Sequence, residues 1–127
     1  SADSFINDFE KASQLIYDAT GIRPDIFRFP GGSITAFNKN IYPEIIEEME
    51  KKGYVYFDWN TSSGDATKGA TVKSIISEAG SPLNKSNGIL LMHDINPLTN
   101  EALQDIIDIY SDYAFLPLTK NVKPVHF

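Results

Sequence analysis

The sequence contains no cysteine and only two histidines, His93 and His126, among its 127 residues. The lack of cysteine excludes disulfides, thiolate metal sites and cysteine nucleophiles. No apolar run approaches the roughly 18 residues that a membrane-spanning helix needs. Basic residues are also few, because 11 Lys and Arg stand against 17 Asp and Glu, for a formal charge of −6. This acidic balance argues against a protein that binds nucleic acid by neutralising phosphates.

The remaining composition, 42% hydrophobic and 22% charged, is typical of a globular protein with a core. Apolar periodicity predicts helices over residues 4–19, 43–52, 68–78 and 100–113. Apolar or β-branched runs predict strands over residues 26–29, 54–59, 88–92 and 114–118. This alternation indicates an α/β fold. We expect the first three strands to be parallel neighbours with helices packed outside.

Four strands and four helices make up half a barrel, which leaves strand edges unpaired. The chain also begins with a helix rather than a strand, and its first residue, Ser1, is not methionine. We therefore expect a strand and its loop to be missing upstream of residue 1.

Polar residues follow three of the predicted strands, at the ends where α/β sheets place their sites. They are Arg28 with the turn 30–32, Asp58 with Trp59, and His93. Each has an ordinary structural alternative. Arg28 could form a surface ion pair, Asp58 could cap a loop, and the turn could be a plain turn. Trp59 could be a core residue and His93 a buried structural histidine. Their occurrence at successive strand ends favours a functional site.

Three segments resemble the third, fourth and fifth motifs of the polysaccharide deacetylases, the NodB homology domain of carbohydrate esterase family 4. They are RFPGGS at 28–33, YFDWN at 56–60 and ILLMHD at 89–94. The resemblance implies a partial (β/α) barrel of which residues 1–127 form the C-terminal portion. It also implies an enzyme that hydrolyses N-acetyl groups of an N-acetylglucosamine polymer, such as peptidoglycan or a chitin-like chain. Such enzymes are exported bacterial proteins, so an extracellular or cell-envelope location is expected.

The resemblance assigns catalytic roles to three residues. His93 would be the general acid that protonates the leaving amine. Asp58 would hydrogen-bond His93, and Arg28 would orient a catalytic aspartate that belongs to the family's first motif. These roles suit the hydrolysis of an amide, which needs an activated water, stabilisation of the tetrahedral intermediate and a proton for the amine.

Substrate binding is assigned to four further residues by the same resemblance. The backbone N–H of Gly31, next to Pro30, would help to stabilise the oxyanion. Trp59 and Leu91 would line the pocket for the acetyl methyl group. In many family members an aromatic residue occupies the position of Gly31, so here a stacking surface is lost while the N–H is kept.

The first two family motifs, which carry an aspartate pair and two histidines, are absent from the sequence. The family uses a divalent metal, usually zinc, and His93 and His126 alone cannot supply its two-histidine, one-carboxylate site. We therefore expect this chain to bind no metal in the family manner and to need a missing N-terminal segment. Two alternatives remain open: a non-catalytic carbohydrate-binding or structural module, and a domain-swapped homodimer in which a second copy closes the strand edges.

Overall fold

The computed structural model describes residues 1–35, 39–81 and 88–127. These residues form two compact units, which are described separately. The first comprises residues 1–58 and 117–127, and the second comprises residues 59–116. No helix in the described ranges is both long enough and apolar enough to cross a membrane.

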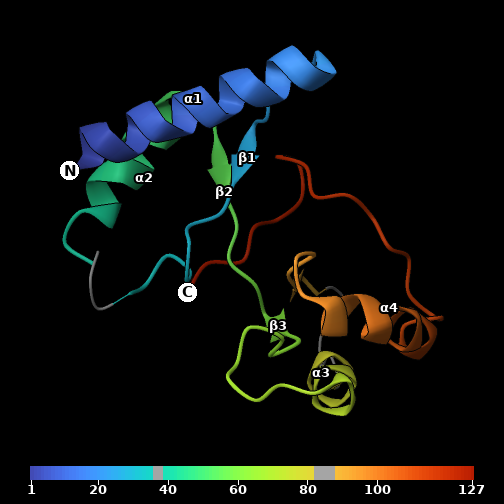
Figure 1. The fold of residues 1–127 in the computed structure, drawn as a ribbon. Helices are drawn as coiled ribbons and strands as arrows, with labels where there is room; N and C mark the ends of the chain where they lie inside the picture. Colours follow the sequence, from blue (N-terminus) through green and yellow to red (C-terminus); the bar gives the residue numbers. More distant parts are fainter. Residues whose placement is uncertain (36–38, 82–87) are drawn as a thin grey trace. The chain divides into compact units, whose positions relative to one another are not determined.

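In the first unit, helices α1 (Ala2–Thr20) and α2 (Tyr42–Lys51) pack beside the parallel strands β1 (Ile26–Phe27) and β2 (Val55–Tyr56) (Figure 1). The Ser1 hydroxyl caps α1 by accepting a bond from the Ser4 N–H. Gly21 ends α1 in the left-handed conformation that glycine adopts without steric penalty. The strand pairing confirms the parallel arrangement predicted for residues 26–29 and 54–59.

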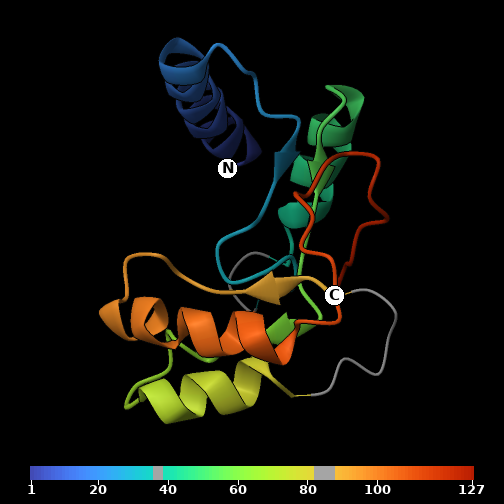
Figure 2. The same ribbon diagram turned by 90° about the vertical axis from the view of Figure 1, so that its right-hand side faces the viewer.

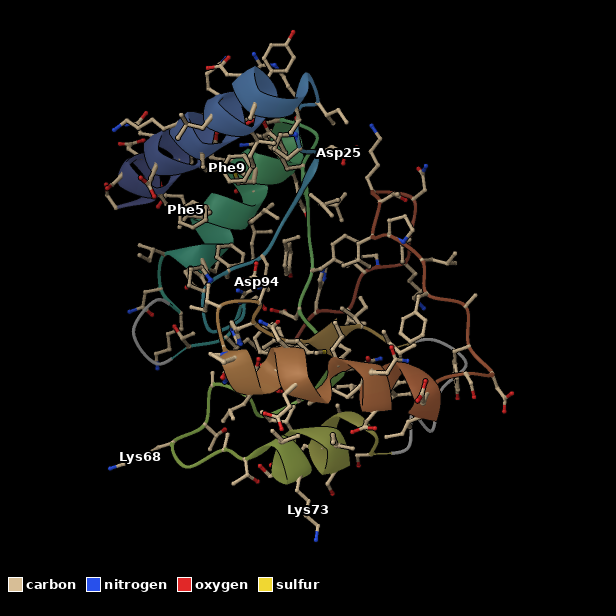
Figure 3. The ribbon with its side chains drawn as sticks, turned by 45° about the vertical axis from the view of Figure 1, so that its right-hand side comes forward. Phe5, Phe9, Asp25, Lys68, Lys73 and Asp94 are labelled. Carbon is tan, nitrogen blue, oxygen red and sulfur yellow. The ribbon has the colours of Figure 1, made fainter. Side chains whose placement is uncertain are left out.

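Aromatic side chains fill the core of this unit. Phe5 and Phe9 point from α1 towards the rings that follow it in the chain (Figure 3). Phe29 is completely buried and stacks on Tyr42, the first residue of α2, with ring centroids 4.2 Å apart. Because Phe29 directly precedes Pro30, this packing holds the start of the turn 30–33.

Ser13 is a defect in this packing. It lies within α1, is 1% exposed, and its hydroxyl has no hydrogen-bond partner among the described residues. A buried hydroxyl without a partner is destabilising, and alanine is the better helix former. We expect Ser13→Ala to stabilise the chain by about 1 kcal/mol in urea denaturation followed by circular dichroism. Ser77→Ala is the control, because Ser77 lies exposed on a helix and changes helix propensity alone. An equal gain in both variants would contradict the prediction.

In the second unit, strands β3 (Thr61–Ser62) and β4 (Leu90–Leu91) pair in parallel. Helices α3 (Val72–Ala79) and α4 (Pro97–Ile109) lie side by side (Figure 2). The core between the two helices consists of buried side chains from both, namely Ile75, Ala79, Ala102 and Ile106, with Tyr110 just beyond α4. Thr71 and Ser74 form a capping box at the start of α3, and the Asn96 side chain caps α4.

Three predictions about the strands need correction. The predicted strand 88–92 does pair in parallel, but with β3 rather than with residues 54–59. β3 itself lies between the predicted strand 54–59 and the predicted helix 68–78, where the sequence predicts neither a strand nor a helix. Residues 114–118 form no strand. They are exposed, and no described strand pairs with them.

The last three residues lie along the end of β2 in the first unit. The Asp58 N–H donates to the Val125 carbonyl over 2.7 Å. The His126 ring stacks on Tyr56 with centroids 3.7 Å apart and an interplanar angle of 8°, and its Nε2 lies 3.1 Å from the Tyr56 carbonyl oxygen. The segment 125–127 therefore extends the core of the first unit although it is about 70 residues away in sequence.

Candidate active site

A histidine–aspartate pair follows β4 in the second unit. The Nδ1 atom of His93 lies 2.9 Å from Oδ1 of Asp65. The His93 backbone N–H donates to Oδ2 of the same carboxylate over 2.6 Å. Asp65 thus binds both the ring and the backbone of one residue, which fixes the direction in which the imidazole points.

The Asp65 carboxylate has further support from α4. The Thr99 hydroxyl donates to Oδ2 over 2.8 Å, and the Asn96 side-chain amide donates to the Asp65 carbonyl over 2.7 Å. The Asp65 side chain is only 2% exposed, whereas that of His93 is 33% exposed. A buried carboxylate held by several hydrogen bonds therefore carries a histidine that is partly exposed to solvent.

Burial alone would raise the pKa of Asp65, but hydrogen bonds from the His93 ring, the Thr99 hydroxyl and the His93 N–H outweigh it and lower the pKa to about 2. Asp65 is therefore ionised at neutral pH and can only accept hydrogen bonds. Nδ1 of His93 must then carry the shared proton. This leaves Nε2 as the ring nitrogen available for a reacting group.

The prediction that Asp58 is the carboxylate partner of His93 is wrong. The His93 ring bonds Asp65 instead. The Asp58 carboxylate accepts its bonds from Ser33 and from the Phe127 N–H, within the first unit. Sequence reasoning placed Asp58 beside His93 because both follow predicted strands, but in the structure it is β3, the strand after Asp58, that pairs with β4.

Asp65 is not among the predicted site residues because it lies between the predicted strand 54–59 and the predicted helix 68–78. Its burial depends on His93 and Thr99, which lie 28 and 34 residues further along the chain. The glycine that precedes Asp65 is a local sequence signal for its position. Gly64 adopts a φ of +65°, and a Cβ there would lie 2.2 Å from a carboxylate oxygen of Glu78. A Gly-Asp pair in a polar segment marks such a tight turn, which here delivers Asp65 to the end of β4.

The turn after β1, in the first unit, contains Arg28, Pro30 and Gly31. Gly31 and Gly32 adopt φ values of +76° and +92°, and the Gly32 N–H donates to the Phe29 carbonyl over 3.0 Å. A residue with a side chain would be strained at either glycine, so the two glycines make this tight turn possible. Arg28 is exposed and donates from Nη1 to the Phe29 carbonyl.

The remaining predicted substrate-binding residues lie in both units. Pro30 lines a cavity of about 760 Å³ together with Phe5, Tyr42 and polar residues of α1. Trp59 and Leu91 belong to the second unit, where Leu91 pairs with Ser62 across β3 and β4. Both side chains are half-buried. The roles assigned to Pro30, Trp59 and Leu91 stay predictions.

The described residues contain no group of three or more His, Asp or Glu side chains that could hold a metal ion. They therefore do not fit the divalent-metal site that the family resemblance implies.

No family model matches the chain, but proteins of known structure do. The catalytic domain of a peptidoglycan N-acetylglucosamine deacetylase from Eubacterium rectale is 32% identical, with a TM-score of 0.92 over all of this chain and 61% of its own. The polysaccharide deacetylase Bc1974 from Bacillus cereus, at 24% identity, shares the fold with a TM-score of 0.82 over 97% of this chain and 62% of its own.

A curated Bacillus subtilis protein named "Putative polysaccharide deacetylase YheN" is 28% identical over 95% of this chain. The chain spans 44% of that relative and about three fifths of the two solved structures. Its α/β fold with parallel strands is consistent with part of a NodB-type barrel. The resemblance predicted from the motifs is therefore confirmed: the chain is similar in sequence and fold to the polysaccharide deacetylases of carbohydrate esterase family 4.

Proposed function

We propose that this chain supplies the proton-donating part of a polysaccharide N-deacetylase, which releases acetate from an N-acetylglucosamine polymer such as peptidoglycan. The observation that carries the proposal is the bond between Asp65 and Nδ1 of His93. It is supported by the similarity to the Eubacterium rectale enzyme. An exported, cell-envelope location is part of the proposal, because the substrate is a wall polymer.

His93 acts through Nε2 in this reaction. Water adds to the acetamide carbonyl, the C–N bond breaks, and the amine leaves with a proton from Nε2 of the imidazolium. The ionised Asp65 stabilises the charged ring and holds it in one orientation throughout. The backbone N–H of Gly31 is the proposed donor to the oxyanion, while Arg28 is proposed to orient a catalytic aspartate from outside the chain.

Residues outside this chain complete the site in our proposal. The chain corresponds to about three fifths of its structural relatives, and its described residues form no metal site. We propose that a further segment of the same domain holds the family's divalent metal. A polysaccharide-binding module without catalysis and a homodimer of this chain are the competing possibilities.

The test is acetate release from peptidoglycan and from chitin oligosaccharides. We expect the 127-residue chain to release none on its own, with or without added zinc. Covalently completed with the remaining two fifths of the Eubacterium rectale domain, it is expected to release acetate, and a chelator is expected to stop the reaction. Zinc-dependent activity of the isolated chain would contradict the proposed need for a further segment. Polymer binding without acetate release by the completed domain would favour the binding module.

A further inference from the structure

Asp58 is a buried carboxylate for which the proposed reaction has no direct use. It lies two residues after the end of β2 and is only 1% exposed. Its Oδ1 accepts a hydrogen bond from the Ser33 N–H over 2.8 Å, and its Oδ2 accepts one from the Ser33 hydroxyl over 2.5 Å. Oδ2 also accepts a bond from the Phe127 N–H over 2.9 Å. Each oxygen thus accepts at least one hydrogen bond from a donor of the first unit.

These bonds join three segments that are distant in sequence. Ser33 lies 25 residues before Asp58, and Phe127 lies 69 residues after it. The Asp58 N–H completes the connection by donating to Val125. Charge-assisted bonds such as these are about twice as strong as neutral ones, so the carboxylate is a strong polar link between the turn and the segment 125–127.

Asparagine would not reproduce this arrangement. It has one acceptor oxygen, and its amide group would face an N–H or O–H donor in place of the second oxygen. The environment of Asp58 therefore favours a carboxylate, because only a carboxylate accepts all three of these bonds.

We propose that Asp58, with the backbone N–H of Phe127 as its third donor, is a positioning device for the turn 30–33. A backbone bond from the Gly32 N–H to the Phe29 carbonyl closes the turn, which contains two successive glycines and is therefore conformationally permissive. Asp58 anchors the turn at Ser33, the residue after these glycines. The inference rests on the proposed function, in which the N–H of Gly31 serves the oxyanion, and it assigns Asp58 to that turn rather than to His93.

The first test uses the 127-residue chain and amide hydrogen exchange measured by NMR. We expect Asp58→Asn to speed exchange at the Ser33 amide by about tenfold, the loss of a bond worth about 1.4 kcal/mol. Ser33→Ala, a milder change that keeps the backbone N–H, is expected to have a smaller effect of the same sign. Asp112→Asn is the matched control, because Asp112 is exposed and the chemical change is the same. Unchanged exchange at Ser33 in Asp58→Asn would overturn the inference.

The part played by Phe127 can be tested separately. Phe127→Pro removes both the ring and the N–H that bonds Asp58, whereas Phe127→Ala removes the ring alone and keeps the N–H. We expect faster Ser33 exchange in the proline variant and a smaller change in the alanine variant. Equal effects of both variants would show that the ring and not the hydrogen bond matters, and would overturn this part.

The second test uses the completed deacetylase domain. We expect Asp58→Asn to lower kcat by about tenfold with little change in KM, and to leave the shape of the pH–rate profile unchanged. Ser33→Thr keeps both donors and is expected to retain more activity than Ser33→Ala. A shift of the pH profile in Asp58→Asn like that of an Asp65 variant would overturn the positioning role. Faster Ser33 exchange together with no deacetylation by the wild-type domain would support the role and refute the proposed function.

Discussion

Asp65→Asn is expected to destabilise the second unit by about 3 kcal/mol at pH 7. The substitution removes a buried charge that accepts bonds from the His93 ring, the His93 N–H and the Thr99 hydroxyl. Removing the charged acceptor from such a buried network leaves buried donors unsatisfied, and this destabilises the fold more than removing both partners would. Trp59 is the only tryptophan and belongs to this unit, so its fluorescence during urea denaturation reports the effect.

The effect of Asp65 also depends on pH in a definite direction. Its folded pKa of about 2 lies below the ordinary value of 3.8, so ionised Asp65 stabilises the fold. This contribution, about 2 kcal/mol, is fully present above the ordinary value and is lost as the pH falls through about 2. Roughly half should be gone at pH 3. The difference in the free energy of unfolding between wild type and Asp65→Asn should therefore become smaller as the pH falls.

Asp105→Asn, at an exposed position of α4, is the matched control for Asp65. It should change the stability by less than about 0.5 kcal/mol. The difference in the free energy of unfolding between wild type and Asp65→Asn could instead stay constant from pH 7 to pH 3. The pKa of the Asp65 carboxyl would then not be lowered, and the account of its hydrogen bonds would be wrong.

His93→Ala should lower kcat of the completed domain about 10²- to 10⁴-fold, the usual contribution of a general acid. Metal content, measured by elemental analysis, should not change, because His93 is proposed as an acid and not as a ligand. Lys68→Ala is a suitable surface control, since Lys68 points away from the loop before α3 (Figure 3).

His93→Gln separates the chemical role of His93 from a structural one. Glutamine can keep a hydrogen bond to Asp65 but cannot deliver a proton at neutral pH. We expect it to restore stability relative to His93→Ala without restoring turnover. Recovery of turnover in His93→Gln would show that the residue only supports the fold.

The parallel β1–β2 pair and the helices could be predicted from the sequence because their signals are local. Apolar spacing, Pro43 at the start of α2 and Gly21 at the end of α1 each act within a few residues. The helices appear within a few residues of their predicted bounds, from residue 4 against Ala2 in α1 to residue 68 against Val72 in α3. The strand predicted at 114–118 failed for the opposite reason. Its apolar residues match a strand, but pairing needs a neighbour that the sequence does not specify.

The candidate site was only partly predictable, because the hydrogen-bond partners of its residues depend on the tertiary structure. His93 was found from its place after an apolar run, and the family resemblance reinforced it. Its partner depended on which strand pairs with β4, and the pairing of β3 brings Asp65 rather than Asp58 to His93. Asp58 was rightly singled out as an unusual residue, but its donors, Ser33 and Phe127, lie in segments that no local pattern connects.

The way in which the first unit is split around the second has a consequence for synthesis on the ribosome. All residues of the second unit, 59–116, have been made once residue 116 is added. In the first unit, Asp58 cannot form its hydrogen bonds to Val125 and Phe127 until residues 125–127 have been made. At about 5–20 residues per second, the order of translation gives the second unit a lead of the order of one second. We therefore expect the second unit to fold before residues 125–127 can bind Asp58. The aromatic core of the first unit lies within residues 1–58 and does not depend on that later segment.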